Sequence, residues 1–347
     1  MSLYYYLKIK AYSFFNSQLG KSILNLLSGF VHVEGLIKNA SKNKFPFIIS
    51  ITIDTESGYV GSNDWRIWQK AKPEAYIGFY KGIENWRRLL NKHKAKATFF
   101  LSTNCFSAKG DDYNKILNQL KLLLKEGHEI GLHLHPDSDL ALQSLSGKKF
   151  DATSARFYDG KEINEIVFAS KNLIKKHLGI NATSFRWGNW ALNTDAVKAL
   201  QKNSFRIDSS AVPGIKGHRN DRMHYDWSGV SAHYPWKLST IDYQNTEHQD
   251  SKVIEIPIAT FDFLGLRLRA DPANSTLLKA CFDCYYKNAG RANKQFIFAV
   301  ISHSIEATHN DGSITKVIDA MDEFLSYTKK FRDVEFKTLN ESYKSIK

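Results

Sequence analysis

The sequence predicts an α/β fold, a (β/α) barrel of seven or eight strand–helix units. Two observations lead to this prediction. Short apolar runs of strand length alternate with stretches of helical periodicity over about 300 residues. That alternation is typical of parallel strands whose faces are covered by helices. Residue types that carry chemistry follow the apolar runs, and barrel enzymes collect their active sites at the carboxyl ends of the strands.

The expected strands begin after a polar stretch at residues 39–44. They are 47–53, 97–102, 129–134, 205–208, 253–258, 296–302 and 334–338, with a weaker candidate at 183–186. Helical periodicity predicts helices over 163–178 before Gly179, after the capping pair Asn193 and Thr194, and after Ser313. Residues 211–229 and 239–251 fit neither pattern and are expected to overhang the barrel mouth. We divide the chain into residues 1–44, an aromatic and basic helical segment, and 45–345, the barrel domain.

Composition limits the classes of partner. The 347 residues are 43% hydrophobic and 24% charged, which is ordinary for a globular protein. The net charge of +13 favours an anionic substrate or membrane surface. We find no nucleic-acid-binding motif, and the lysines are dispersed, so we expect no nucleic-acid partner. The three cysteines argue against a disulfide framework and suit a reducing compartment.

The N-terminal segment allows two interpretations. It shows neither the order of a secretory signal nor an apolar run of about 20 residues, so we expect a cytoplasmic protein without a transmembrane helix. Leu3–Val33 is nevertheless aromatic and basic. It is either an amphipathic helix that makes peripheral contact with the inner membrane face or a helix that packs on its own domain.

Two pairs of ligand-type residues predict a metal site. His133 and His135 lie two residues apart at the end of one apolar run, and Asp54 and Glu56 repeat this spacing at the end of another. Residues i and i+2 of a strand point to the same face, so each pair can converge on one point. Either motif alone is common, because Asp and Glu also suit turns and caps. Together they favour a divalent cation held by two histidines and one acid, with the other acid as general base.

Three further residues follow expected strands. Arg186 is a candidate to hold the base through a two-pronged contact, and its alternative is an ordinary surface arginine. Asp208 could orient a histidine or cap a turn. His303 follows the most apolar run and is a candidate general acid for a leaving amine, or else a structural histidine at the barrel rim.

These motifs resemble the polysaccharide deacetylase family of carbohydrate esterases, which includes chitooligosaccharide and peptidoglycan deacetylases. The resemblance runs from about residue 49 to about residue 303. It is carried by Thr52-Ile53-Asp54-Thr55-Glu56, Ala97-Thr98-Phe99-Phe100, His128-Glu129-Ile130-Gly131-Leu132-His133, Phe185-Arg186 with Trp190, Asp208-Ser209-Ser210, and His303.

The resemblance implies a deformed (β/α) barrel of the polysaccharide deacetylase type and a divalent metal, Zn²⁺ first among them. It implies that Asp54 is the base, that Glu56 is a ligand alongside His133 and His135, and that Arg186 orients Asp54. It further implies that Asp208 tunes His303, the catalytic acid.

The sequence departs from the family pattern in three places. The usual adjacent aspartates are replaced by Asp54-Thr55-Glu56, and the metal histidines are two residues apart instead of four. Trp187-Gly188 stands where a proline and an aromatic residue commonly follow the arginine. These departures indicate a divergent branch.

The expected function is metal-dependent removal of an N-acetyl group from an amino sugar of a polysaccharide or glycan precursor. Trp190, Trp227 and Tyr225 are candidates to stack against the sugar rings, although packing is the commoner role for each of them. One alternative is a deformylase or amidohydrolase acting on a lipid-linked amino sugar or a small cyclic amide. Another is a catalytically inactive barrel that binds a glycan.

Overall fold

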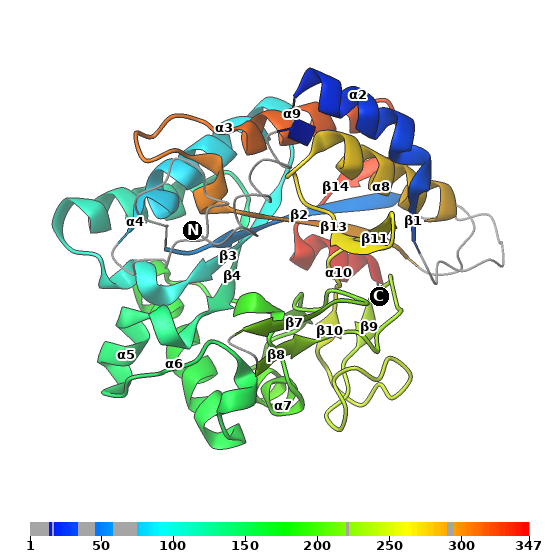
Figure 1. The fold of residues 1–347 in the computed structure, drawn as a ribbon. Coiled ribbons are helices and arrows are strands. Elements are labelled where there is room, and N and C mark those ends of the chain that lie inside the picture. Colours follow the sequence, from blue (N-terminus) through cyan, green and yellow to red (C-terminus); the bar gives the residue numbers. More distant parts are fainter. Residues whose placement is uncertain are drawn as a thin grey trace.

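A curled, mostly parallel sheet forms the centre of the protein (Figure 1). The computed structural model describes residues 14–15, 17–33, 46–57, 75–219, 222–289 and 295–346. Along the sheet the strands are β13 (Ile297–His303), β2 (Phe47–Thr55), β3 (Ala97–Ser102), β4 (Glu129–Leu134), β5 (Ser184–Trp187), β6 (Ile207–Asp208), β10 (Ile254–Glu255) and β9 (Trp236–Lys237). Strand β14 (Val334–Phe336) also pairs with β2, and β9 pairs with β10 in the antiparallel sense.

The sheet curls almost into a closed barrel. Its two ends meet through a single parallel bridge between Ile258, just beyond β10, and Ala299 of β13. The barrel is therefore irregular on this side, where β6 and β10 are only two residues long. This arrangement confirms the predicted deformed (β/α) barrel.

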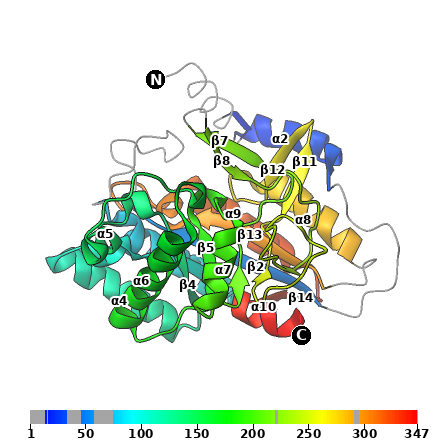
Figure 2. The same cartoon turned by 90° about the horizontal axis from the view of Figure 1, so that it is seen from below.

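Helices surround the sheet (Figures 1 and 2). They are α2 (Gln18–Leu27), α3 (Ile83–His93), α4 (Gly110–Lys125), α5 (Leu140–Ser146), α6 (Gly160–Leu178), α7 (Thr194–Lys202), α8 (Ser275–Ala289), α9 (Lys316–Thr328) and α10 (Leu339–Ile346). The expected caps at Gly179 and Asn193 are confirmed, whereas α9 is capped by Thr315 instead of Ser313. None of the helices in these described stretches is both long and apolar enough to cross a bilayer.

Alternation along β2 separates the core from the barrel interior. Ile49, Ile51 and Ile53 belong to the large apolar core that includes residues of α3 and α9. The residues between them face the interior, where Thr52 and Asp54 both receive hydrogen bonds from one arginine of β5. Helix α10 closes the amino-terminal end, because its Leu339 and Tyr343 pack with Ile48 and Ile297. The polar interior is therefore left for the opposite, carboxyl-terminal end of the strands.

Two features beside the barrel were not expected. Residues 211–229 contain a hairpin, β7 (Lys216–Arg219) and β8 (Arg222–Asp226). A separate three-stranded sheet joins β1 (Val31–His32) to the hairpin β11 (Thr260–Phe263) and β12 (Leu266–Arg269). Through β1 and α2, the described part of the N-terminal segment is attached to the barrel domain.

Candidate metal and acid–base centre

The parallel register brings the predicted residues together at the carboxyl ends of neighbouring strands. His303 on β13 is paired with Asp54 on β2, and His133 on β4 is paired with Arg186 on β5. Asp54 near the end of β2 and Glu56 just after it lie on the interior side of that strand, and His135 is the first residue after β4. Residues more than 240 positions apart in the sequence thus share one centre.

Glu56, His133 and His135 form a cluster of metal-ligand type. Their ligand atoms all lie within 4.8 Å of one another. The two histidine Nε2 atoms are 3.2 Å apart, and Glu56 Oε2 lies 2.8 Å from His135 Nε2 and 3.7 Å from His133 Nε2. Ligand bonds of about 2 Å in a tetrahedral site place donor atoms about 3.3 Å apart. The three residues therefore fit one small divalent cation.

Hydrogen bonds outside the cluster orient the imidazole of His133. Its Nδ1 lies 3.0 Å from the carbonyl oxygen of Arg186, so the ring donates there and Nε2 is turned toward the cluster. The pKa of Glu56 lies well below its usual value: burial alone would raise it, but the charge and hydrogen bonds of His135 and His133 outweigh burial. The carboxylate of Glu56 is therefore ionised, as it must be to bind a metal ion.

Gly188 gives His135 its space. A Cβ atom at Gly188 would lie 2.6 Å from both Cε1 and Nε2 of His135, and 2.4 Å from the Leu134 carbonyl oxygen. Contacts this short do not occur between real atoms, so only glycine leaves the imidazole where it is. Two of the departures from the family pattern therefore belong together: the short histidine spacing puts His135 against residue 188, and Trp187-Gly188 places a glycine there.

Asp54 is fixed by the guanidinium of Arg186. Arg186 is fully buried and donates from Nη1 to Asp54 Oδ1 at 2.7 Å, from Nη2 to Thr52 Oγ1 at 2.9 Å and from Nε to the Ser209 carbonyl at 2.7 Å. Burial by itself would raise the pKa of Asp54, but the charges of Arg186, His133 and His303 hold it below the usual value. Arg186 is thus no surface arginine, and it leaves Asp54 Oδ2 facing the cluster.

His303, at the end of β13, faces both Asp54 and the Glu56–His133–His135 cluster. Its Nε2 lies 3.9 Å from both Asp54 Oδ2 and Glu56 Oε1. Its Nδ1 donates to Glu306 Oε1 at 2.9 Å, while Glu306 Oε2 accepts from the His303 backbone N–H at 3.0 Å and from Ser302 Oγ at 2.7 Å. Burial lowers the pKa of His303, but Glu306, Asp54 and Glu56 together raise it to about 9. The ring is therefore protonated at neutral pH.

The expected pairing of Asp208 with His303 is wrong, because the carboxylate at His303 Nδ1 belongs to Glu306. Asp208 instead accepts hydrogen bonds from Ser210 and lies beside Glu255 on the adjacent strand. Burial and the neighbouring Asp208 carboxylate raise the pKa of Glu255 well above its usual value. Burial and Asp208 therefore favour the protonated form of Glu255, whose Oε1 accepts from the Ala211 N–H at 3.0 Å.

The aromatic candidates separate into two groups. Trp227 is fully buried and donates from Nε1 to the Trp190 carbonyl at 2.9 Å, so its ring cannot stack against a sugar and that expectation is wrong. Trp190 and Tyr225 are half-buried and meet edge to face at 5.3 Å. The guanidinium of Arg269 lies 4.2 Å from the Trp190 ring centre. The expectation that Trp190 and Tyr225 stack against sugar rings stays a prediction.

The sequence did not reveal Glu306, Glu255 or the role of Gly188. Glu306 had a readable signal, because an acid three residues after a strand-ending residue is the pattern of a capping box, and His303 and Glu306 form one. Glu255 carried no such signal. Its role depends on the pairing of β6 with β10, which only the folded sheet shows.

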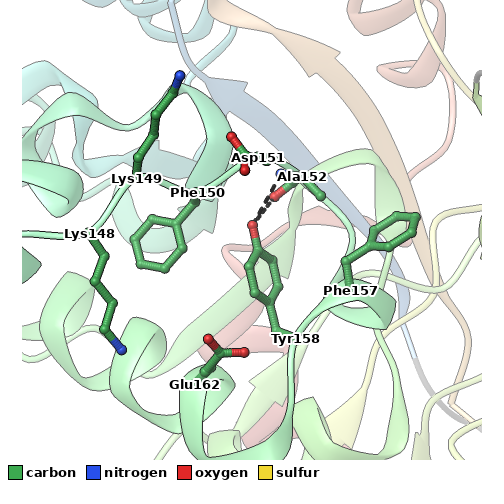
Figure 3. A pocket seen from close by; sticks show the side chains of 8 residues that line it. All are labelled: Lys148, Lys149, Phe150, Asp151, Ala152, Phe157, Tyr158 and Glu162. Atoms are coloured by element: carbon green, nitrogen blue, oxygen red, sulfur yellow. Dashed lines mark hydrogen bonds between the residues drawn. The ribbon is translucent and has the colours of Figure 1, made fainter.

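A shallow pocket elsewhere on the surface is separate from this centre. It has a volume of about 430 Å³ and is lined by residues 148–152, 157, 158 and 162 (Figure 3). In it, Tyr158 is tied to the backbone of Ala152, and Lys148 pairs with Glu165 at 3.3 Å. None of the predicted site residues lines this pocket.

Comparisons with known proteins agree with the fold. Residues 76–207 match the sequence model of the family described as polysaccharide deacetylase. No curated protein matches the chain. A protein assigned as a glycoside hydrolase/deacetylase from Parabacteroides distasonis is 15% identical with a TM-score of 0.58, over 88% of this chain and 71% of that one.

Two further solved structures are similar over most of both chains. A protein assigned as a polysaccharide deacetylase from Mycobacterium smegmatis is 15% identical with a TM-score of 0.56, over 89% of this chain and 93% of that one. Puue allantoinase is 12% identical with a TM-score of 0.55, over 85% of this chain and 88% of that one. At these identities the likeness concerns the fold.

Proposed function

We propose that the chain is a divergent member of the polysaccharide deacetylase family and that it is a metal-dependent hydrolase, which removes an N-acyl group, acetyl first among them, from an amino sugar of a glycan or glycan precursor. The observation that carries this proposal is the convergence of two functions on one centre. Glu56, His133 and His135 offer three ligand atoms, while Asp54 and His303 offer an acceptor and a donor of protons beside them.

The residues suit the two proton transfers of amide hydrolysis. A divalent ion held by Glu56, His133 and His135 would supply a Lewis acid for the acyl carbonyl and acidify the attacking water. Asp54 Oδ2 accepts the proton that the water loses when its oxygen bonds to the acyl carbon, because Arg186 occupies Oδ1. His303 Nε2 gives its proton to the amine nitrogen when the C–N bond breaks. The products are the free carboxylic acid and the amino sugar.

Glu306 keeps His303 ready for this step. Its carboxylate holds Nδ1, so the acidic proton at Nε2 is the one that faces the centre. A histidine with a raised pKa also stays charged until the leaving nitrogen takes its proton. These properties support the role of general acid for His303.

A panel of N-acetylated amino sugars, assayed for released acetate with and without a chelator, tests the proposal. We expect acetate release that the chelator abolishes and added Zn²⁺ restores, and that falls at least about 100-fold in Asp54→Asn and in His303→Gln. Activity that survives the chelator would contradict the proposed metal dependence. A folded protein that is inactive on every substrate would favour the glycan-binding alternative.

Allantoin and N-formylated amino sugars belong in the same panel. The structural likeness to an allantoinase shows that this fold also occurs in a protein of that name. Turnover of allantoin in preference to the sugars would favour the cyclic-amide alternative, and release of formate alone would favour the deformylase.

A further inference from the structure

An exposed apolar surface joins helix α2 to the tip of the β11–β12 hairpin. Five large side chains on it are between 55% and 83% exposed: Leu19, Leu26, Phe30, Leu264 and Leu266. We call these five residues the α2–hairpin patch. Single exposed apolar residues are ordinary, but a group of them marks a surface that binds another protein or a membrane.

Strand pairing brings Phe30 and Leu266 to the tip of the hairpin. Val31 of β1 is paired with Phe263 of β11 in the antiparallel sense, so Phe30 lies level with Leu264 at the hairpin tip. Leu266 is paired with Phe263 across the hairpin. Helix α2 leads into β1 through Ser28–Phe30. Gly20 and Leu24 of α2 are buried, whereas Leu19 and Leu26 are exposed on another side of the helix.

Folding does not account for the leucine at the hairpin tip. Leu264 has a φ of 49° and Gly265 a φ of 79°, the two left-handed positions of a tight turn in which Asn-Gly is favoured. A leucine in that conformation costs about 1 kcal/mol, and more than half of its surface stays exposed, so burial offsets little of this cost. Leu264 is 55% exposed at the tip of the hairpin.

The surrounding sequence favours an anionic bilayer as the occupant. Residues 1–33 contain three lysines and no aspartate or glutamate, and residues 4–12 hold four tyrosines. Tyrosine and lysine are the residues that bridge an apolar phase and charged lipid head groups. The whole chain carries a net charge of +13, which attracts it to such a surface.

We propose that the α2–hairpin patch docks the protein on a phospholipid bilayer with anionic head groups. Leu264 and Leu266 enter the boundary between head groups and acyl chains, and the face of α2 that carries Leu19 and Leu26 lies along it. The other end of the hairpin reaches the catalytic side, since Arg269 stacks on Trp190. Leu266 and Arg269 are about 10 Å apart along the strand, so a docked bilayer lies close to the edge of the candidate site.

The test is flotation of the full chain with vesicles of phosphatidylcholine, alone or with phosphatidylglycerol. We compare the wild type with Leu264→Asn/Leu266→Thr, in which Asn suits the left-handed turn and Thr suits the strand, so the fold is kept. The matched control is Leu145→Gln/Phe168→Gln, which removes two equally exposed side chains on α5 and α6.

We expect the wild type and the control to bind the anionic vesicles, and the patch variant to bind them about tenfold more weakly. Binding should weaken without phosphatidylglycerol and at high salt. Absence of wild-type binding, or equal binding by the patch variant, would overturn the proposal. So would a vesicle-free dimer that only the patch variant dissociates, because the patch would then be an interface between two copies. Acetate release from a soluble substrate should be the same in all three proteins, so this surface and the proposed reaction can fail separately.

Discussion

Glu306 accepts a hydrogen bond of 2.9 Å from His303 Nδ1, and the two residues are only three positions apart. The same carboxylate binds the backbone N–H of His303 and the hydroxyl of Ser302. The proposed acid is therefore oriented by a carboxylate from its own turn of the chain. This local device takes the place that the sequence led us to expect for Asp208.

Glu306→Gln tests this arrangement. Glutamine keeps the size and a hydrogen bond but removes the charge that helps to raise the pKa of His303. We expect activity to fall about 10- to 100-fold, the usual range for an orienting partner. A lower pKa means that His303 loses its proton at lower pH, so the alkaline limb of the pH–activity profile should shift downward. An unchanged alkaline limb in a normally folded variant would refute the role of Glu306.

Arg186 should be irreplaceable by lysine. Lysine keeps the charge but cannot donate to Asp54, Thr52 and the Ser209 carbonyl at once. We expect Arg186→Lys to lose at least about 100-fold in activity, since Asp54 would lose its fixed orientation. Arg186→Met should cost about 3–5 kcal/mol of unfolding free energy as well, because it leaves a buried carboxylate unpaired. Denaturant unfolding measures the second effect, and a loss below 1 kcal/mol would show that Asp54 is not held as described.

Gly188→Ala should weaken metal binding without touching a ligand. The new methyl group would force His135 out of its position, and we expect Zn²⁺ affinity, measured by competition with a chromogenic chelator, to fall about 10- to 100-fold. The control is Gly29→Ala, because no atom lies within 4 Å of a Cβ at Gly29. Equal affinities in the two variants would mean that His135 is not a ligand.

His128 should make stability depend on pH. Burial, and the nearby Lys96, lower the pKa of His128 from 6.5 to about 4, and its Nδ1 accepts from the Ala97 N–H at 3.2 Å. The unfolded chain therefore binds this proton more readily than the folded protein. The stabilisation is fully present above pH 6.5 and is lost as the pH falls toward 4, by at most about 3 kcal/mol. His128→Asn keeps an acceptor but cannot titrate, so urea unfolding should show a smaller loss for this variant between pH 6.5 and 4. Identical losses would contradict the assignment.

Periodicity was enough to predict most of the sheet. The expected strands 97–102 and 129–134 have the observed bounds, because long apolar runs between polar breaks leave little choice. The same reasoning placed both ligand pairs at strand ends, and the structure puts Glu56 Oε2 3.7 Å from His133 Nε2. Their catalytic roles are still predictions.

Other features were beyond sequence reasoning, and each has a physical cause. Strands β6 and β10 are shorter than expected because the barrel is irregular where it closes. Trp227 sits in a polar excursion, yet the excursion folds back and buries it. Glu255 acts through its neighbour on another strand, and that neighbour is set by topology rather than by spacing in the sequence.

The central claim is that Glu56, His133 and His135 hold one divalent cation. Its most direct test is the metal content of the purified protein after dialysis against Zn²⁺, measured by mass spectrometry for the wild type, His133→Asn/His135→Asn and the distant control His248→Asn. We predict one equivalent of zinc in the wild type and in the control, and none in the double variant. A wild type without zinc, or a double variant that keeps it, would contradict the claim.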